Sequence, residues 1–480
     1  MIRGLQGLLR RNAFARGVSV LVGGTAAAQL LIILASPLLT RLYTPEDFGL
    51  LGVFTSLLAL FTVIASLRYE LAIPLPESDT EAANVLVLSL LVVLIITSIC
   101  GLAVFFAGKH IALVLDTPAL VNYAWMLPIG VLLVGVYQVF NYWATRQKAF
   151  GDVARSRVSQ TVSMLAVQFI ASGFGGIALL LGQVGGQGVG SLRLARAARS
   201  HRDFYCWTWR GVRQAAIRYK QFPIFSTWSG LFNTAGTQLP PLMFAAFFSS
   251  GAAGVYVLAH RVLALPMSIL GDAIGKVFFS NAADAYREDR LAPLVRNVHY
   301  MLAQIAMPPT VLLVFTGPEL FALVFGENWR QSGEFSRYMA PWLYMVFITS
   351  PLSTVFLVLE RENIGMYFQG TLLLFRILAI FVGAILLGDL ITTVALFTIV
   401  STLYYFGFLA WICLASGNNM MDLIGPTRVA LFKSGLCISP VLLTLNIFSE
   451  NSYWLYFGIF VTVIMFFLYY KSAVKKVALI

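Results

Sequence analysis

Long apolar stretches recur along the whole chain, and they constrain its fold more than any other feature. Of the 480 residues, 59% are hydrophobic and 11% are charged, whereas a soluble domain has about 45–50% apolar residues. About 20 helical residues cross a bilayer, so we predict an all-α polytopic membrane protein with about 14 transmembrane helices. The predicted spans lie near residues 18–40, 48–67, 82–106, 119–141, 155–172, 174–192, 224–248, 254–280, 298–316, 335–359, 366–387, 390–414, 431–448 and 453–470.

The basic residues between these spans predict the orientation. With the N-terminus inside, 27 of the 33 lysines and arginines fall on the cytoplasmic side, as the positive-inside rule requires. Two more, Arg261 and Arg376, fall within predicted spans. We therefore expect both termini to be cytoplasmic. The four basic residues left outside are Arg41, Lys109, Arg330 and Arg337.

A long basic segment interrupts the apolar pattern and predicts a division into lobes. We expect an N-lobe at residues 1–192, a basic linker at 193–223, a C-lobe at 224–414 and a C-terminal helical hairpin at 415–480. Tryptophans among the linker's arginines indicate an amphipathic helix at the inner headgroup surface. A plain positive anchor and a specific contact with a lipid pyrophosphate both stay open as its role.

The starts of the two lobes are weakly repeated. Gln29 lies in an AAQL sequence ahead of Pro37, and Gln238 lies in a GTQL sequence directly before Pro240 and Pro241. Two halves that both begin with broken helices frame a central site in many transporters. The repeat therefore predicts two pseudo-symmetric six-helix lobes around a central cavity.

Residues 254–279 form an apolar stretch that nevertheless carries charges. At 100° per residue, Arg261, Ser268 and Asp272 lie on one face of a regular helix, and Pro266 predicts a kink. An arginine at bilayer depth costs about 2.5–3.5 kcal/mol on insertion scales, so this stripe should face a wet cavity. A structural pair between Arg261 and an acid on another helix is the alternative.

Motifs for covalent chemistry do not occur in the sequence. None of the four histidines lies in a catalytic motif, and the four cysteines lack metal-ligand spacing. The acidic pair Glu46 and Asp47 fits a helix start, with Thr44 as N-cap and Pro45 at the first helical position. We therefore expect neither an enzyme nor a bound metal or cofactor.

Arginines within or next to the predicted spans suit the binding of phosphate, because the planar guanidinium group donates paired hydrogen bonds and stays charged. Arg261 and Arg376 lie inside spans, Arg68 ends the second span on the inside, and Arg41 follows the first on the outside. Asp272 is a candidate for binding a coupling cation. Uncharged polar residues that could line a sugar-binding cavity are Gln29, Ser36, Thr40, Gln138, Asn141, Asn233, Thr237 and Gln238.

Several stretches resemble the Wzx-type oligosaccharide flippases of the multidrug/oligosaccharidyl-lipid/polysaccharide (MOP) exporter superfamily. Together with the span pattern, the resemblance covers nearly the whole chain. The stretches are LLTRLYTPEDFGLLGVF (residues 38–54), LRYELAIPLPES (67–78), GVYVLAHRVLALPMSILGDAIGKVFF (254–279) and FGENWRQSGEFSRYMAPWLYMVFITSPLSTVFLVL (325–359).

This resemblance implies a function and a site. Such proteins pass undecaprenyl-pyrophosphate-linked oligosaccharide from the inner to the outer leaflet of the bacterial cytoplasmic membrane by alternating access, for O-antigen, capsule or exopolysaccharide synthesis. Helices 1, 2, 7 and 8 would line a cationic cavity containing Arg41, Arg68 and Arg261, while the place of Arg376 does not follow automatically. The hairpin after Cys413 departs from twelve-span relatives, and it could form a lipid-tail groove or only pack.

Two other functions are compatible with the sequence. A multidrug or cation antiporter of the same superfamily would be expected to carry cavity carboxylates, and a membrane glycosyltransferase or polymerase would form a new bond. The resemblance further implies membrane lipids and a polysaccharide polymerase as partners, with no nucleic acid. The direction of transport could come from the membrane potential, from H⁺ or Na⁺ antiport, or from consumption of the glycan outside, and the sequence leaves these alternatives open.

Overall fold

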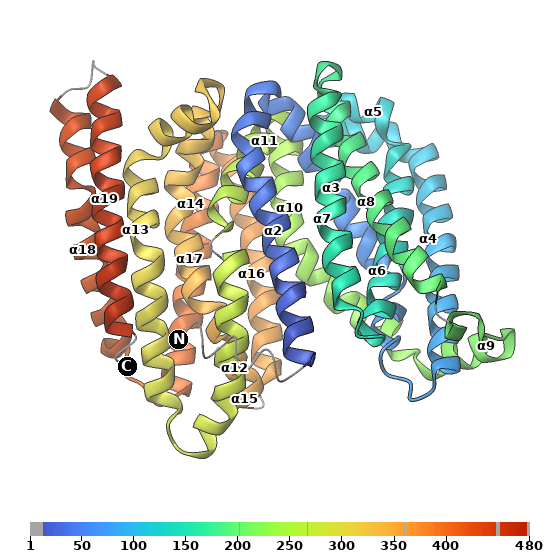
Figure 1. Ribbon diagram of the computed structural model, residues 1–480. Helices are drawn as coiled ribbons and strands as arrows, with labels where there is room; N and C mark the ends of the chain where they lie inside the picture. The colour runs from blue at the N-terminus through green and yellow to red at the C-terminus, as the bar shows by residue number, and fades with distance from the viewer. Residues whose placement is uncertain (1–12, 201, 266, 360, 448–451, 478–480) are drawn as a thin grey trace. The chain divides into compact units, whose positions relative to one another are not determined.

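The computed structural model describes residues 13–477 apart from residues 201, 266, 360 and 448–451, and the described chain is helical throughout, with no strand (Figure 1). The predicted all-α fold is confirmed. In chain order the main helices are α2 (Ala13–Leu42), α3 (Pro45–Ala65), α4 (Asp79–Val114), α5 (Ala119–Tyr123), α6 (Met126–Arg146), α7 (Phe150–Ile170), α8 (Gly176–Arg199), α9 (Trp209–Arg218), α10 (Thr227–Phe247), α11 (Ser250–Leu263), α12 (Asp272–Arg287), α13 (Leu291–Phe325), α14 (Arg330–Thr349), α15 (Val355–Val358), α16 (Glu362–Val382), α17 (Leu390–Ala415), α18 (Met420–Ile447) and α19 (Ser452–Val477).

Every predicted span contains a helix. Within the described residues, nine helical segments are long and apolar enough to cross a membrane by length and composition. The other five predicted spans correspond to α7, α8, α10, the α11–α12 segment and α19, which are shorter or less apolar. The count of 14 transmembrane helices therefore stays a prediction.

The start of α3 follows the predicted capping pattern. The Thr44 backbone N–H donates to Asp47 Oδ2 at 3.0 Å, and the Asp47 N–H donates to Thr44 Oγ1 at 3.3 Å. Pro45 occupies the first turn, where its missing N–H costs nothing. The acidic pair here is thus part of a helix start, as predicted.

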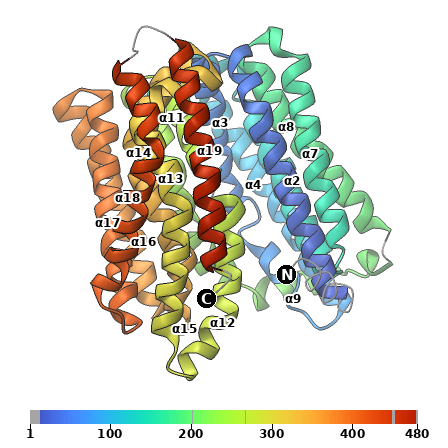
Figure 2. The same ribbon diagram turned by 60° about the vertical axis from the view of Figure 1, so that its left-hand side comes forward.

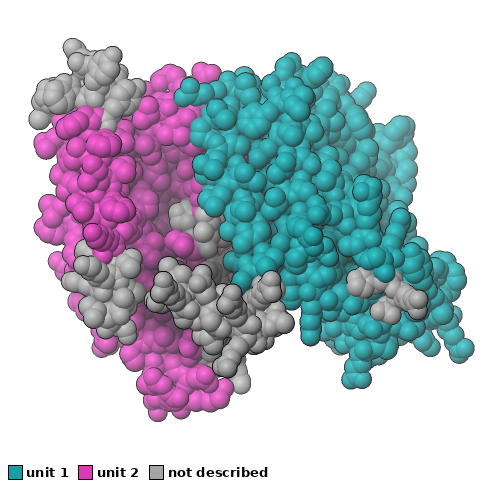
Figure 3. All heavy atoms as spheres, viewed as in Figure 1, with its two compact units in different colours: residues 1–257 teal, residues 258–480 magenta. Residues whose placement is uncertain are grey.

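Two compact units make up the chain, residues 1–257 and 258–480 (Figure 3). The predicted lobes stay a prediction, because this division reflects compactness alone. In the first unit, α2 packs on α7, α3 on α10, and α4 on α6 and α9. Side chains at the core of α4, α6, α8 and α9 are Leu86, Val139, Trp143, Leu194 and Val212.

Within the first unit, α3 and α11 approach each other closely through glycines. A Cβ added to Gly49 would lie 1.8 Å from the Ser250 carbonyl oxygen, and one added to Gly254 would lie 1.9 Å from the Pro45 carbonyl oxygen. Neither position has room for a side chain. The backbones therefore touch where any larger residue would hold the helices apart.

In the second unit, α13 packs on α14 and α18, and α18 packs on α19. Figures 1 and 2 show α18 and α19 side by side next to α13, which is the predicted C-terminal hairpin. Polar contacts fix the hairpin to α13: Tyr469 Oη donates to Gln304 Oε1 at 2.5 Å, and Tyr470 Oη donates to the Ile305 carbonyl at 2.9 Å.

The predicted span at residues 254–280 is a broken helix. The segment α11 ends at Leu263, a π-helical turn covers Met267–Gly271, and α12 begins at Asp272. The break lies around Pro266, which itself is outside the described residues. Because no regular α-helix, with its rotation of 100° per residue, runs from Arg261 to Asp272, it stays a prediction that these two residues share a helix face.

We predict that Gly254→Ala destabilises the first unit, because the new methyl group would force α3 and α11 apart. Overpacking of this kind costs about 1–3 kcal/mol, so the detergent-purified variant should melt at a lower temperature than the wild type. Gly23→Ala in α2 is the control, since a Cβ there meets nothing within 4 Å. Equal melting temperatures for both variants would contradict the close contact.

Candidate functional site

The connection after α3 holds Arg68 in an unusual backbone conformation. Leu67 has φ 48° and Arg68 has φ 62°, both in the left-handed region that costs non-glycine residues energy. A 3₁₀ turn at Tyr69–Ala72 follows directly. This geometry turns the chain sharply, so that Arg68 and Glu70 lie next to each other.

Glu70 is the most deeply buried charged group of this connection. Its side chain is 1% exposed, the Ser66 hydroxyl donates a hydrogen bond to its carboxylate, and Arg68 Nη1 lies 3.9 Å from its Oε1. Burial raises the pKa of Glu70 above its ordinary value, while the Ser66 hydrogen bond and the Arg68 charge oppose that rise. Protonation of Glu70 would therefore loosen its hold on Arg68.

The Arg68 guanidinium lies against a glycine on another helix. A Cβ added to Gly230 of α10 would lie 2.4 Å from Arg68 Nη2 and 2.9 Å from Nε. Arg68 is 24% exposed, and its buried Nε has no hydrogen-bond partner in the described part of the chain. Tyr142 of α6 is close enough to feel the charges of both Arg68 and Glu70. We call Ser66, Arg68, Glu70, Tyr142 and Gly230 the Arg68 cluster.

A polar face of α10 continues from the Arg68 cluster. Asn233 and Thr237 follow Gly230 by three and seven residues, which places all three on one helix face. Asn233 and Thr237 are exposed, and Gln238 Nε2 donates to Thr237 Oγ1 at 3.4 Å. The structure therefore brings Asn233 and Gln238 onto the helix that Arg68 contacts, as a site that binds both phosphate and sugar would require.

Helix α6 adds two amides. The side-chain oxygens of Gln138 and Asn141 are buried, and neither has a hydrogen-bond partner among the residues described. Asn141 directly precedes Tyr142 of the Arg68 cluster. Buried polar atoms that lack partners are uncommon, so these two amide oxygens are unusual for a helix interior.

The predicted site residues on α2 lie apart from these contacts. Gln29 is half-buried in α2, and Arg41 is exposed in its last turn. The structure gives neither side chain a hydrogen bond or ion pair with a described residue. Their predicted role in the cavity stays a prediction.

In the second unit, Arg376 of α16 is buried in an aromatic cage. The guanidinium carbon lies 4.8 Å from the Trp342 ring centre, 5.5 Å from that of Phe397 and 5.9 Å from that of Tyr405. Its Nε donates to Ser401 Oγ at 3.0 Å, and the residue is only 6% exposed. Such stacking stabilises a cation where little water reaches, so Arg376 has the surroundings of a structural cation, and its substrate role stays a prediction.

Arg261 lies in the second unit, near the end of α11. It is partly exposed, and it forms no hydrogen bond or ion pair with any residue that the structure describes. The neighbouring His260 ring stacks at 5.8 Å from Trp342 of the cage around Arg376. Asp272 begins α12, but its side chain is outside the described residues, so its predicted coupling role stays a prediction.

The sequence analysis did not identify four members of the Arg68 cluster as functional: Ser66, Glu70, Tyr142 and Gly230. Glu70 follows Arg68 by two residues in LRYELAIPLPES, a stretch that carries the family resemblance, and this pairing was the available signal. Tyr142 and Gly230 had no comparable local signal. Across the described residues no group of three metal-ligating side chains occurs.

Comparisons with solved structures define the class of protein. The fold is similar to the lipid II flippase MurJ in an inward closed conformation, with a TM-score of 0.73, 12% identity, and coverage of 97% of this chain and 99% of that one. It is also similar to an inward-facing multidrug resistance MATE family transporter of the MOP superfamily, with a TM-score of 0.65, 16% identity, and coverage of 83% and 96%. The chain has the fold that these two proteins share, and with its long apolar helical segments it is a multi-pass membrane protein.

The sequence then identifies the family. Residues 38–334 match the polysaccharide biosynthesis protein family, and the chain belongs to it. It is 22% identical over 286 residues to the teichuronic acid biosynthesis protein TuaB of Bacillus subtilis (strain 168), a match that spans only 58% of each chain. It is 22% identical over 356 residues to the lipopolysaccharide biosynthesis protein WzxC of Escherichia coli (strain K12), across 73% of this chain and 71% of that one. The predicted Wzx-type resemblance is confirmed.

We predict that Glu70→Gln changes how stability depends on pH. Because burial raises the pKa of Glu70 above 4.5, the folded chain binds this proton more tightly than the unfolded chain does. The stability that Glu70 contributes is therefore complete below pH 4.5 and is lost as pH rises through the raised pKa. Melting temperatures measured from about pH 4 to pH 8 should fall less steeply in the variant.

The control for this measurement is Glu77→Gln, which changes an exposed carboxylate in the same connection. It should leave the wild-type pH profile unchanged. If Glu70→Gln also followed the wild-type profile, the carboxyl group would not be titrating in the way its burial requires.

We predict that Gly230→Ala separates function from stability. The new methyl group would displace the flexible end of Arg68, while the helix itself gains up to about 1 kcal/mol from alanine. Cells that depend on the variant should show less surface polysaccharide. The melting temperature should change little, because the gain in the helix opposes the loss from a weakened contact between Arg68 and Glu70. Gly236→Ala on the same helix is the control, since a Cβ there meets nothing within 4 Å. Full polysaccharide output in both variants would argue against a role for the position of Arg68.

Proposed function

We propose that this chain is a flippase that moves undecaprenyl-pyrophosphate-linked oligosaccharide from the inner to the outer leaflet of the bacterial cytoplasmic membrane. It would work by alternating access and serve the synthesis of a polysaccharide such as O-antigen, capsule or exopolysaccharide. Support comes from membership of the polysaccharide biosynthesis protein family and from a fold similar to that of a lipid II flippase. No covalent step is needed, because the cargo crosses unchanged.

The observation that carries the proposal is that Arg68 is held in a fixed position and is partly exposed. Its guanidinium is partly exposed, is kept in place by Glu70 and Gly230, and adjoins the polar face of α10 with Asn233. A pyrophosphate could accept charge-assisted hydrogen bonds from Arg68, and amides along α10 and α6 suit sugar hydroxyls. Arg261 would supply a second positive charge, with Arg41 and Arg376 as further candidates.

The negative charge of the cargo affects which direction of transport is favoured. Moving one negative charge outward across a cytoplasm-negative potential is favoured by about 2.3 kcal/mol per 100 mV. The proposal includes coupling to H⁺ or Na⁺ at Asp272 as a further source of drive. It also places both termini in the cytoplasm, and a polysaccharide polymerase is the proposed consumer of the delivered oligosaccharide.

The second candidate function is a multidrug or cation antiporter. Two observations favour it: the fold is similar to that of a MATE family transporter, and Glu70 is a buried carboxylate. Against it, Arg68 lies 3.9 Å from Glu70 and would repel an organic cation there. Uptake of organic cations by proteoliposomes would support this candidate, whereas product formation by the purified protein would support the less favoured glycosyltransferase or polymerase.

The test of the proposed function replaces Arg261. Arg261→Ala should leave folding intact and cause lipid-linked repeat units to accumulate in the inner leaflet. Surface polysaccharide should fall about tenfold or more, because one charged hydrogen-bond donor to the pyrophosphate is lost. Arg261→Lys should restore only part of the output, because an ammonium group lacks the planar fork. Surface polysaccharide and membrane-bound lipid-linked sugar are the two readouts.

A control for this test is Arg330→Ala, which removes an arginine that pairs with Glu327 and Glu319 at the surface. That variant should resemble the wild type in both readouts. Normal surface polysaccharide in both Arg261 variants would exclude a role for this residue in moving the cargo.

A further inference from the structure

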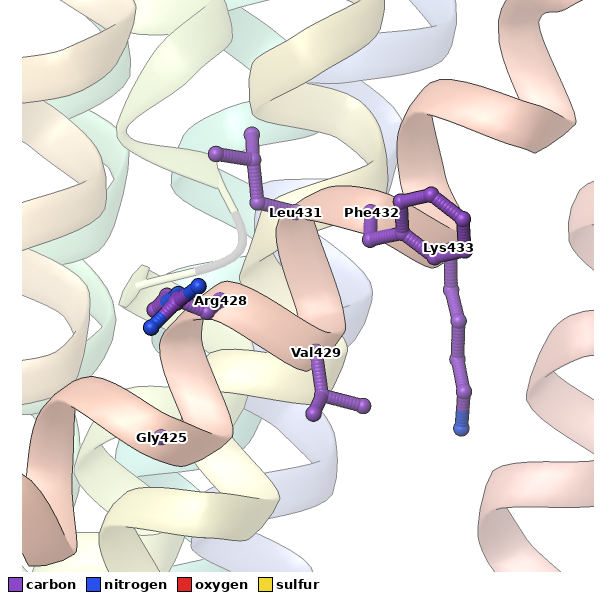
Figure 4. A pocket seen from close by; sticks show the side chains of 6 residues that line it. All are labelled: Gly425, Arg428, Val429, Leu431, Phe432 and Lys433. Carbon is purple, nitrogen blue, oxygen red and sulfur yellow. The ribbon is translucent and has the colours of Figure 1, made fainter.

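A cavity of about 720 Å³ lies beside helix α18 of the second unit (Figure 4). Its volume is within the range of small-molecule and lipid sites, about 300–1,000 Å³. Two cations, Arg428 and Lys433, line it among apolar side chains. The described lining residues are Gly425, Arg428, Val429, Leu431, Phe432 and Lys433.

The surface around this cavity is apolar, as expected for a helix that faces lipid. Phe432 is 70% exposed, and Val429 and Leu431 are also exposed. These side chains follow one another along a helix that meets the length and hydropathy requirements of a membrane span. The natural neighbour of such a surface is the hydrocarbon of a lipid.

Lys433 reaches back along the helix. It lies 13 residues after Met420, so its backbone is about 20 Å into a helix that rises 1.5 Å per residue. Figure 4 shows its side chain extending back toward the end of α18 at which Gly425 lies. A lysine within a membrane helix turns in this way when its ammonium group seeks a polar or charged layer. The ammonium group thus lies nearer to the start of α18 than the Lys433 backbone does.

Both cations lack an acidic partner in the described part of the chain. Asp422, the acid at the start of α18, lies 3.8 Å from Arg296 of α13 instead. Arg428 and Lys433 form no ion pair or hydrogen bond with any residue that the structure describes. Arg428 is eight residues after Met420, and its uncompensated charge beside an apolar surface is complementary to a lipid phosphate. Lys433 adds a second positive charge to the lining of the same groove.

A second, smaller cavity lies on the other side of Leu431. It has a volume of about 270 Å³, and Leu431 lines both cavities. Its walls are largely apolar and come from α13, α14 and α17, with Met307, Val311 and Phe315 among them. If the phosphate of a lipid lies at Arg428, one of its hydrocarbon chains could occupy this apolar cavity on the other side of Leu431.

We infer that the groove on α18 is a binding site for an anionic membrane phospholipid, held by its phosphate at Arg428 and Lys433 and by a hydrocarbon chain against Leu431 and the apolar cavity beyond it. This lipid is a resident of the membrane and differs from the carried cargo. The site is on the C-terminal hairpin, which contacts α13 and the core of the second unit. Lipid bound there would support the packing of the hairpin.

The experiment is native mass spectrometry of the full-length protein with added phosphatidylglycerol or phosphatidylcholine. The wild type should retain phosphatidylglycerol in preference to phosphatidylcholine. Arg428→Gln with Lys433→Gln should reduce phosphatidylglycerol retention about tenfold or more, because each basic residue near a lipid phosphate contributes to binding. Arg428→Lys with Lys433→Arg keeps both charges and should retain it.

The matched control is Arg287→Gln with Arg290→Gln, which removes two exposed arginines of the second unit that pair with Asp284 and Glu288. It should bind phosphatidylglycerol like the wild type. Equal retention by the wild type and the Arg428/Lys433 glutamine variant would overturn the inference, as would equal retention of phosphatidylcholine. A competition with equimolar undecaprenyl phosphate gives a further test. If undecaprenyl phosphate displaced phosphatidylglycerol from the wild type, and this displacement were absent in the glutamine variant, the groove would be assigned to the carried lipid and the inference would be overturned.

Discussion

The pairing of Glu70 with Arg68 is the interaction on which the candidate site depends. A carboxylate that is 1% exposed is stable only if a charge and hydrogen bonds compensate for its lost hydration, and Arg68 and Ser66 supply them. Arg68 in turn occupies the space over Gly230, which a side chain at that position would fill. The strained backbone at Leu67 and Arg68 is the cost of this arrangement. The result is a positive charge held in place and partly open to a ligand.

Irregular backbone occurs near three of the four arginines that the sequence analysis identified, Arg68, Arg261 and Arg376. One π-helical turn, Phe222–Ser226, opens into α10 just before Gly230, the neighbour of Arg68. Another, Met267–Gly271, follows Arg261, and a third, Gly383–Leu387, follows Arg376. Such turns are frequent at functional sites, because they free backbone groups and allow a helix to bend. A transporter that alternates between two states needs bending points of this kind next to its binding groups.

The sequence predicted what depends on local pattern. Apolar runs predicted the helices, and Thr44, Pro45 and Asp47 predicted the start of α3, because capping acts within one helical turn. It could not predict that Arg68 meets Gly230, since these residues are 162 positions apart and a glycine carries no sign of what fills its space. Nor could it place Arg376 among Trp342 and Phe397, because three helices must pack before that cage exists. The Arg68 cluster is a product of tertiary structure.

The central claim is that Arg68 binds the pyrophosphate of a lipid-linked cargo, and direct binding to the purified protein tests it most closely. The affinities of undecaprenyl pyrophosphate, undecaprenyl phosphate and undecaprenol should be compared for the wild type and Arg68→Ala. The account predicts that affinity falls in that order for the wild type, and that Arg68→Ala weakens pyrophosphate binding about tenfold while leaving undecaprenol unchanged. Equal affinity of both proteins for undecaprenyl pyrophosphate would contradict it.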